Sequence, residues 1–199
     1  MLRIERVKAI EALREYRRRT RLMVDVNLPM EYLLRSKVFG FYDEDNSLIG
    51  GFLIVMAGDL RSLTQLPAKG LIPDHVDEWD IGEVNGLWLA PTVRKKSISI
   101  KFWLHVAKEV IFSGKKHFIY TYTSKKKHLG DIYSNVKPIT LFEGETEILP
   151  GMDESEMETI QLVEVKNIVK AVFSTPQFFM KRLFGRRRVV HQTRSLAMN

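Results

Sequence analysis

The feature that most constrains the fold is an almost unbroken apolar segment at residues 47–57. Its sequence, Ser-Leu-Ile-Gly-Gly-Phe-Leu-Ile-Val-Met-Ala, contains a single polar side chain. β-Branched and aromatic residues favour a strand in this segment. A strand that is apolar at nearly every position is typical of a sheet that is covered on both faces. We therefore expect a sheet with helices packed on both sides.

The segments around this strand alternate between helical and strand patterns. Apolar residues favour helices at residues 7–23, 30–34, 97–112 and 129–135. Further β-rich runs predict strands at residues 37–42, 83–90, 118–123, 139–142 and 159–165. Residues 60–80 lack a clear period and are expected to form a loop with a short helix. The order predicts an α/β (α+β) fold with a mixed central sheet and helices on both faces.

The positive charge is concentrated near the end of the chain. The protein has 199 residues, 31 of them Lys or Arg and 24 of them Asp or Glu, which gives a net charge of +7. Eight of these basic residues and none of the acidic ones follow residue 165, so the first 165 residues carry a net charge of −1. We therefore predict a domain at 1–165 and a basic extension at 166–199. A nearly neutral body disfavours nucleic acid as a partner, and a nucleic-acid binder acting through the extension alone is the least favoured hypothesis.

Other compositional features exclude several classes of site. The chain has no cysteine, which excludes disulfides, thiol nucleophiles and cysteine-ligated metals. The histidines show no paired metal-ligand spacing, so no metal is expected. Residues 1–6 lack an apolar signal core, and no apolar run reaches the roughly 18 residues that a membrane span needs. We expect a cytoplasmic protein, and leave peripheral contact with a membrane open.

Residues 174–188 combine bulky apolar and basic side chains. Thr175-Pro176 is a helix-start signal and Gly185 a stop signal. Between and after them lie five large apolar side chains and five Lys or Arg residues. This pattern predicts a basic amphipathic helix. It is suited to an anionic membrane surface, and the alternative is a helix docked on the domain or on a protein partner.

Residues 83–103 read as a strand, a stop at Pro91, a basic turn and a helix. Such a turn directs free backbone N–H groups and the helix dipole toward one point, beside Arg94, Lys95 and Lys96. The arrangement predicts an anion site suited to a pyrophosphate. The alternative is a solvated basic turn.

This arrangement resembles the GNAT family of acyl-CoA N-acyltransferases. The family's strand pattern E-x-x-x-L-x-V-x-P is similar to residues 83–91, and its loop pattern R/Q-x-x-G-x-G/A is similar to residues 94–99. The resemblance implies a GNAT-like fold that takes acetyl-CoA or a longer acyl-CoA as donor. It implies backbone pairing with pantetheine at Leu87, Trp88 and Leu89, and pyrophosphate binding at Arg94, Lys95, Lys96, Ser97, Ile98 and Ser99.

Ser97 and Ser99 stand where the family pattern has glycine. Glycine lets the backbone approach a phosphate closely, whereas serine is tolerated where φ stays negative. A serine can also cap the helix or donate its hydroxyl to phosphate. The sequence therefore leaves open whether the two serines weaken phosphate binding or contribute to it.

The resemblance also implies an acid–base pair. Glu83 matches the strand carboxylate that takes a proton from the acceptor amine, and Tyr133 matches the tyrosine that protonates the departing thiolate. Tyr133 follows Leu129 as in the family pattern L-x-x-x-Y-x-x-x-G-F, but Lys137-Pro138 replaces Gly-Phe. The alternatives are a solvated acid at the end of a strand for Glu83 and a core aromatic residue with a wet hydroxyl for Tyr133.

The sequence therefore predicts an N-acyltransferase that moves an acyl group from acetyl-CoA or a longer acyl-CoA to an unknown amine. The alternative is a catalytically silent GNAT-like module that binds a protein or a membrane. The two serines and the missing Gly-Phe motivate this alternative.

Overall fold

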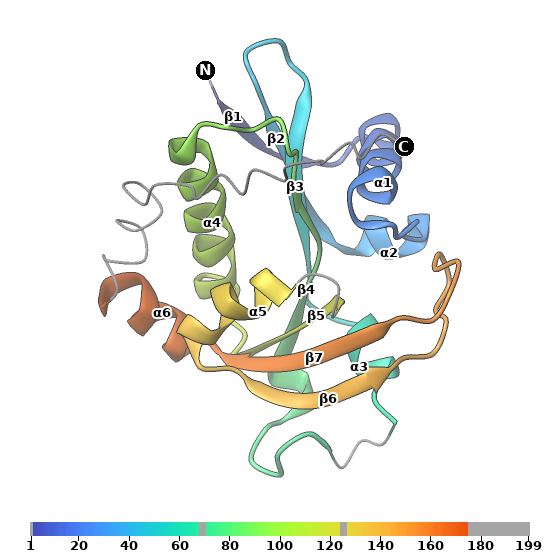
Figure 1. Ribbon diagram of the computed structural model, residues 1–199, viewed down its shortest axis with the longest axis vertical. Helices are drawn as coiled ribbons and strands as arrows, with labels where there is room; N and C mark the ends of the chain where they lie inside the picture. Colours follow the sequence, from blue (N-terminus) through green and yellow to red (C-terminus); the bar gives the residue numbers. More distant parts are fainter. Residues whose placement is uncertain (1, 68–70, 124–126, 175–199) are drawn as a thin grey trace, which may run out of the picture.

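The computed structural model describes residues 2–67, 71–123 and 127–174, so the helix predicted after Thr175 lies outside the described residues. A mixed seven-stranded sheet has the order β1-β2-β3-β4-β5-β7-β6 (Figure 1). Its strands are β1 Arg3–Val7, β2 Lys37–Tyr42, β3 Leu48–Val55, β4 Ile81–Leu89, β5 His117–Thr123, β6 Ile139–Glu145 and β7 Met157–Glu164. Only the β4–β5 pair is parallel among these neighbours. The predicted mixed sheet is confirmed.

Helices cover both faces of the sheet, as predicted (Figure 1). One face carries α1 and α2, and the other carries α4, α5 and α6. The α-helices are α1 Ile10–Val24, α2 Met30–Arg35, α3 Arg61–Thr64, α4 Lys96–Ile111, α5 Lys127–Tyr133 and α6 Val165–Ser174. Short 3-10 turns are η2 Glu78–Asp80 and η4 Ser134–Val136. None of the helices in the described ranges is long and apolar enough to cross a membrane.

β3 lies between two apolar layers. All eight of its residues are buried. Leu53 packs in the layer that contains Tyr16 of α1, whereas Phe52 packs in the layer that contains Phe102 of α4. Alternate side chains of a strand point to opposite faces, so a strand between two layers must be apolar at every position. This confirms the interpretation of residues 47–57.

The structure corrects the first residues of the chain. The sequence pattern placed a helix from Val7, but Arg3–Val7 is the edge strand β1, and α1 begins at Ile10. β1 is short, and of its five residues only Val7 is buried. Short charged edge strands are common because they discourage pairing with other chains. Such a strand lacks the apolar signal that identified the inner strands.

Residues after the last strand form a helix that the sequence analysis did not predict. α6 begins at Val165 and packs against α4 and η4. The boundary between a domain at 1–165 and an extension at 166–199 stays a prediction. Within the described chain, however, residues 166–174 pack on the same layer as α4.

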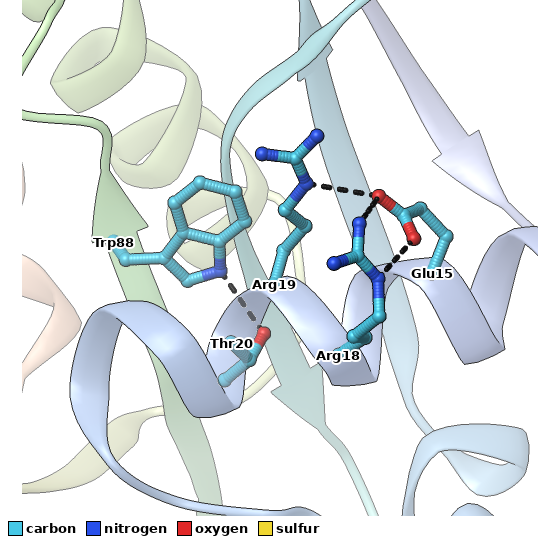
Figure 2. Close-up of polar contacts among 5 residues, drawn as sticks. All are labelled: Glu15, Arg18, Arg19, Thr20 and Trp88. Atoms are coloured by element: carbon cyan, nitrogen blue, oxygen red, sulfur yellow. Dashed lines mark hydrogen bonds and ion pairs between the residues drawn. The ribbon is translucent and has the colours of Figure 1, made fainter.

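Two buried hydrogen bonds attach α1 to β4. The indole Nε1 of Trp88 donates to Thr20 Oγ1 at 3.0 Å, as Figure 2 shows. The hydroxyl of Tyr16 donates to the carbonyl oxygen of Gly86 at 2.7 Å. Both bonds join residues that are far apart in the sequence, and together they fix the helix against the strand that carries the predicted donor site.

α1 also carries a cluster of partly exposed charges. Arg18 and Arg19 both donate to the carboxylate of Glu15, at distances of 2.7 to 2.9 Å (Figure 2). These hydrogen bonds lower the pKa of Glu15 to about 2, and the bond from Arg18 has the largest effect. Because the pairs span three and four residues, they support the helix itself.

Candidate active site

β4 and β5 run side by side for a short distance only. Their pairing covers Ile81–His117, Gly82–Phe118 and Glu83–Ile119. β4 continues to Leu89 and β5 to Thr123, and no further β4–β5 pair forms in the described strands. The strands therefore open after Glu83. Backbone N–H and C=O groups on these inner edges are left for another partner.

A β-bulge distorts β4 at this opening. Gly51 of β3 pairs with Trp88, and Leu53 with Asn85, so two residues of β4 oppose the single Phe52. One of the two is Gly86, whose φ is 55°. This left-handed conformation favours glycine, and a bulge leaves its extra residue unpaired and bends the strand. The second residue, Leu87, lines a cavity.

The cavity has a volume of about 260 Å³ and has residues of both helical layers in its walls. On one side it is lined by Trp103, Val106, Ala107, Val110, Phe118, Tyr120, Leu129, Tyr133, Val136, Val163, Ile168, Ala171 and Val172. On the other side it is lined by Val24, Val26, Arg61, Ser62, Gln65, Met152, Glu156 and Glu158. The charged residues in the wall all belong to the second side, and the wall also contains the uncharged polar residues Asn85, Thr121, Tyr122, Thr123 and Asn135. We call the first side the apolar compartment and the second the charged compartment.

The structure brings some of the predicted site residues together and leaves others apart. Leu87 and Tyr133 both line the cavity. Trp88 is buried and its indole is bonded to Thr20, while Leu89 is half-buried and pairs with Gly50 of β3. Residues 94–99 lie at the beginning of α4, whereas its wall residues start at Trp103. The predicted pyrophosphate loop is therefore separate from the cavity wall.

The loop itself is exposed and basic. Arg94, Lys95 and Lys96 are exposed. Lys95 is the N-cap of α4 and makes no side-chain capping bond. The Lys95 side chain therefore does not cap α4, and the helix dipole adds positive potential at this end of the helix.

The two serines occupy ordinary helical backbone. Ser97 and Ser99 lie within the first turn of α4. The backbone N–H of Ile98, the residue between the two serines, donates to Lys95 O at 3.0 Å. Among the described residues other than glycine, positive φ occurs only at Asp25, Asn46 and Lys137. The serines therefore satisfy the condition of negative φ, and their backbone is unstrained.

Glu83 is the centre of a buried hydrogen-bond network. Its Oε2 accepts from Tyr32 Oη at 2.7 Å and from Arg61 N at 2.9 Å. Its Oε1 accepts from Ser62 N at 2.9 Å, from Ser62 Oγ at 2.7 Å and from Asn85 Nδ2 at 3.3 Å. A carboxylate offers about four lone-pair sites, so these five donors occupy them all.

This geometry corrects one reading of Glu83 and constrains the other. Glu83 is not a solvated acid, because its exposed fraction is 0%. It ties α2 and α3 to β4 and is not among the residues that line the cavity. A role as the base stays a prediction. It would require one of the five hydrogen bonds to give way.

Tyr133 lies in an aromatic cluster on the cavity wall. Its ring centroid is 4.6 Å from that of Tyr120, 5.7 Å from that of Tyr122 and 6.1 Å from that of Trp103. Burial, with a smaller contribution from Tyr122, raises the pKa of Tyr133. The phenol therefore stays protonated at neutral pH, and the residue lies in the cavity wall.

Glu158 is a candidate that the sequence analysis missed. It lies on β7, is half-buried and lines the charged compartment. Its Oε2 accepts from Thr146 Oγ1 at 2.6 Å and from Gln65 Nε2 at 2.9 Å. Burial raises the pKa of Glu158 against the effect of these bonds. A carboxylate with a raised pKa on a cavity wall is suited to act as a general base.

A weak sequence signal existed for Glu158. The sequence pattern predicts the last strand at residues 159–165, but β7 begins at Met157. Glu158, Ile160 and Leu162 then share one face of the strand, and Ile160 and Leu162 are buried in the core. An acid on the same face as core residues is a sign of function.

Arg61 adds a positive charge to the charged compartment. Its guanidinium is half-buried and donates from Nη1 to Pro150 O at 2.8 Å. Burial lowers the pKa of Arg61, but a guanidinium remains charged at neutral pH. Its charge interacts with that of Glu83 and, more weakly, with that of Glu158. Among the described residues, no group of three or more His, Cys, Asp or Glu side chains could hold a metal ion.

No protein-family model and no curated protein sequence matches this chain. Solved structures do match it. FeeM, an N-acyl amino acid synthase from uncultured soil microbes, is 12% identical with a TM-score of 0.63, over 89% of this chain and 98% of that chain. A spermidine/spermine N-acetyltransferase from Vibrio cholerae is 8% identical with a TM-score of 0.57, over 86% and 98% of the two chains.

A GNAT family acetyltransferase from Elizabethkingia anophelis, solved with acetyl-CoA bound, also matches. It is 10% identical with a TM-score of 0.54, over 82% of this chain and 97% of that chain. Identities this low show the fold alone. The chain therefore has the GNAT fold, as the sequence resemblance implied.

Proposed function

We propose that this chain, which has the fold of the GNAT N-acyltransferases, transfers an acyl group from an acyl-CoA thioester to a primary amine. The observation that carries the proposal is the cavity at the β4–β5 opening. It joins an apolar compartment that contains Tyr133 to a charged compartment that contains Glu158. A donor and an acceptor can thus meet at the bulge in β4.

The donor binds along β4. The first turn of α4, with Arg94, Lys95 and Lys96, holds the pyrophosphate. The pantetheine amides pair with the free backbone edge of β4 at Leu87–Leu89. This proposal is supported by the exposure of the basic loop and by the end of β4–β5 pairing at Glu83.

The reaction needs a base and an acid. A C–N bond forms as the amine attacks the thioester carbonyl, the C–S bond breaks, the base takes the amine proton and Tyr133 gives a proton to the thiolate. Glu158 is favoured as the base because it lines the cavity and its pKa is raised. Glu83, the base that the family resemblance implies, is the alternative.

Arg61 points to the class of acceptor. A cation in the same compartment as a basic carboxylate is complementary to a molecule that carries a carboxylate close to its amine, as an amino acid does. The similarity to FeeM, which is named an N-acyl amino acid synthase, supports this choice. We therefore propose an amino acid or a similar small amine as acceptor.

Calorimetric titration with free CoA, acetyl-CoA and a long-chain acyl-CoA tests donor binding. Binding should also raise the melting temperature, because it stabilises the native state only. Arg94→Ala combined with Lys96→Ala should weaken both effects, while Lys101→Ala with Lys108→Ala, at exposed lysines farther along α4, should not. Thiol release with a panel of amino acids then tests transfer.

The competing function is a catalytically silent GNAT-like module. The serines at both glycine positions of the loop favour it. If no CoA species binds to the wild-type protein, the acyltransferase proposal is wrong and the silent module is supported.

A further inference from the structure

The apolar compartment differs from the rest of the cavity in its charge. The described side chains that α4 and α6 contribute to the wall are all uncharged, whereas Arg61, Glu156 and Glu158 lie in the other compartment. Contact between an apolar ligand and this apolar surface removes both from water, which lowers the free energy. A charged or strongly polar ligand would lose its hydration here and would find no ionic partner in return.

The space is larger than an acetyl group requires. The whole cavity measures about 260 Å³. A water molecule occupies about 30 Å³ in the liquid, and a methylene group is of similar size, so the two compartments together have room for roughly eight such groups. Protein interiors are normally close-packed. Even apolar cavities of about 150 Å³ bind small apolar molecules such as benzene.

α6 closes this compartment. Ile168, Ala171 and Val172 line the cavity, while Lys166 and Lys170 of the same helix are exposed. α6 also packs against α4, whose Val106 and Val110 are buried in the wall. The compartment is therefore walled by two helices with their apolar faces toward it, which is the environment that a hydrocarbon chain needs.

We infer that the apolar compartment binds a fatty acyl chain, so that the donor is a medium- or long-chain acyl thioester rather than an acetyl thioester. This inference rests on the proposed function, since the chain must arrive as part of the donor. The pantetheine arm is the competing occupant. Its two amides are better matched by the unpaired backbone edge of β4 than by side chains such as Val110 or Ile168.

The test is a comparison of acetyl-CoA, butanoyl-CoA, hexanoyl-CoA and octanoyl-CoA by calorimetric titration. Each buried methylene contributes up to about fourfold in affinity. We expect octanoyl-CoA to bind at least tenfold more tightly than acetyl-CoA. Ala107→Phe fills the compartment from α4 and should reduce that preference to less than threefold.

Leu104→Phe is the matched control, because Leu104 lies on the same helix and is 41% exposed. It should keep the wild-type preference. Ala171→Phe fills the compartment from α6 and replaces Ala107→Phe if that variant does not fold.

Equal affinity for all four thioesters in the wild-type protein overturns the inference and leaves the acyltransferase proposal standing. A chain-length preference that survives both filling variants also overturns it, since the chain would then bind elsewhere. Failure of every CoA species to bind contradicts the proposed function itself, and the inference with it.

Discussion

The surroundings of Glu83 and Glu158 indicate a structural role for the first carboxylate and a chemical role for the second. Glu83 accepts five hydrogen bonds in a fully buried network. Glu158 has two hydrogen-bond donors, is half-buried and lines the cavity. The five hydrogen bonds hold the Glu83 carboxylate in place. The Glu158 carboxylate, with only two donors, has lone pairs left that can accept a proton.

Glu158→Gln should lower kcat/KM by roughly 10² to 10⁴-fold, because an amide cannot accept the amine proton. Donor affinity should stay unchanged. Since burial raises the pKa of Glu158, the wild-type rate should fall as the pH drops through this raised pKa, and the variant should lose that limb of the profile. A wild-type rate and profile in Glu158→Gln would return the role of base to Glu83.

Glu83→Gln should lower stability, because it replaces a buried acceptor with a group that also carries donors. The loss of one or two charge-assisted hydrogen bonds corresponds to about 2 kcal/mol or more in the free energy of unfolding. Chemical denaturation measures this loss. The family resemblance predicts instead a large fall in rate near neutral pH with donor affinity and stability kept, which would establish Glu83 as the base.

Tyr133→Phe removes only a hydroxyl and keeps the ring contacts with Trp103, Tyr120 and Tyr122. Turnover should fall by roughly 10²-fold or more if Tyr133 protonates the thiolate. Tyr122→Phe is the matched control, since it lies in the same cluster and also lines the cavity. Single-turnover measurements with both variants compare them directly, and equal rates would exclude Tyr133 as the acid.

At the scale of elements, the segment between β6 and β7 closes the charged compartment. Asn27 N, between α1 and α2, donates to Gly151 O at 2.8 Å. Arg61 donates to Pro150 O in the same segment. The loop thus fixes the position of the cation that we propose for the acceptor carboxylate.

Gly151→Ala should displace this loop. Gly151 has a φ of 92°, and an added Cβ would lie 1.9 Å from Asn27 O. Gly114→Ala separates the two effects, because Gly114 has a φ of 85° but nothing within 4 Å of the added atom. Both variants should lose about 1 to 2 kcal/mol of stability from the left-handed backbone, while Gly151→Ala should lose more and should raise the KM for the amine. Equal losses and an unchanged KM would show that the loop does not position the acceptor.

At the scale of the whole molecule, the charge is divided between a nearly neutral body and a basic end. Residues 175–199 lie outside the described residues, so the predicted membrane or partner helix stays a prediction. Residues 166–174 are a different case, because α6 lines the cavity. A truncation that tests the end of the chain must therefore keep α6.

A protein that ends at Ser174 should keep its fold and its affinity for acyl-CoA but lose association with anionic vesicles. Each basic residue near such a surface contributes roughly 1 kcal/mol. Co-sedimentation with anionic vesicles measures the effect, and neutral vesicles and raised salt are the controls. Equal binding by the full-length and truncated proteins would contradict the membrane hypothesis and favour a docked helix.

The sequence by itself determined the parts of this protein that depend on local pattern. The uniform apolar character of residues 47–57 fixed a strand between two layers, and helical spacing located α1 and α4. The basic turn before α4 carried the resemblance to a pyrophosphate loop. Each of these conclusions needs only side chains within one segment, because their period sets which face is buried. The sequence pattern did not predict β1, because this exposed edge strand has no such period.

Only the tertiary structure decided the site. The opening of β4 from β5, the bulge at Gly86 and the cover that α6 provides all depend on how separate segments pair. Glu158 meets Gln65 across 93 residues, and Tyr32 meets Glu83 across 51. Contacts at such separations leave no mark in a local period, since they arise when strands and loops pack around a common core. This packing places Glu83 in a hydrogen-bond network with no free lone pair, and it places Glu158 in the cavity wall.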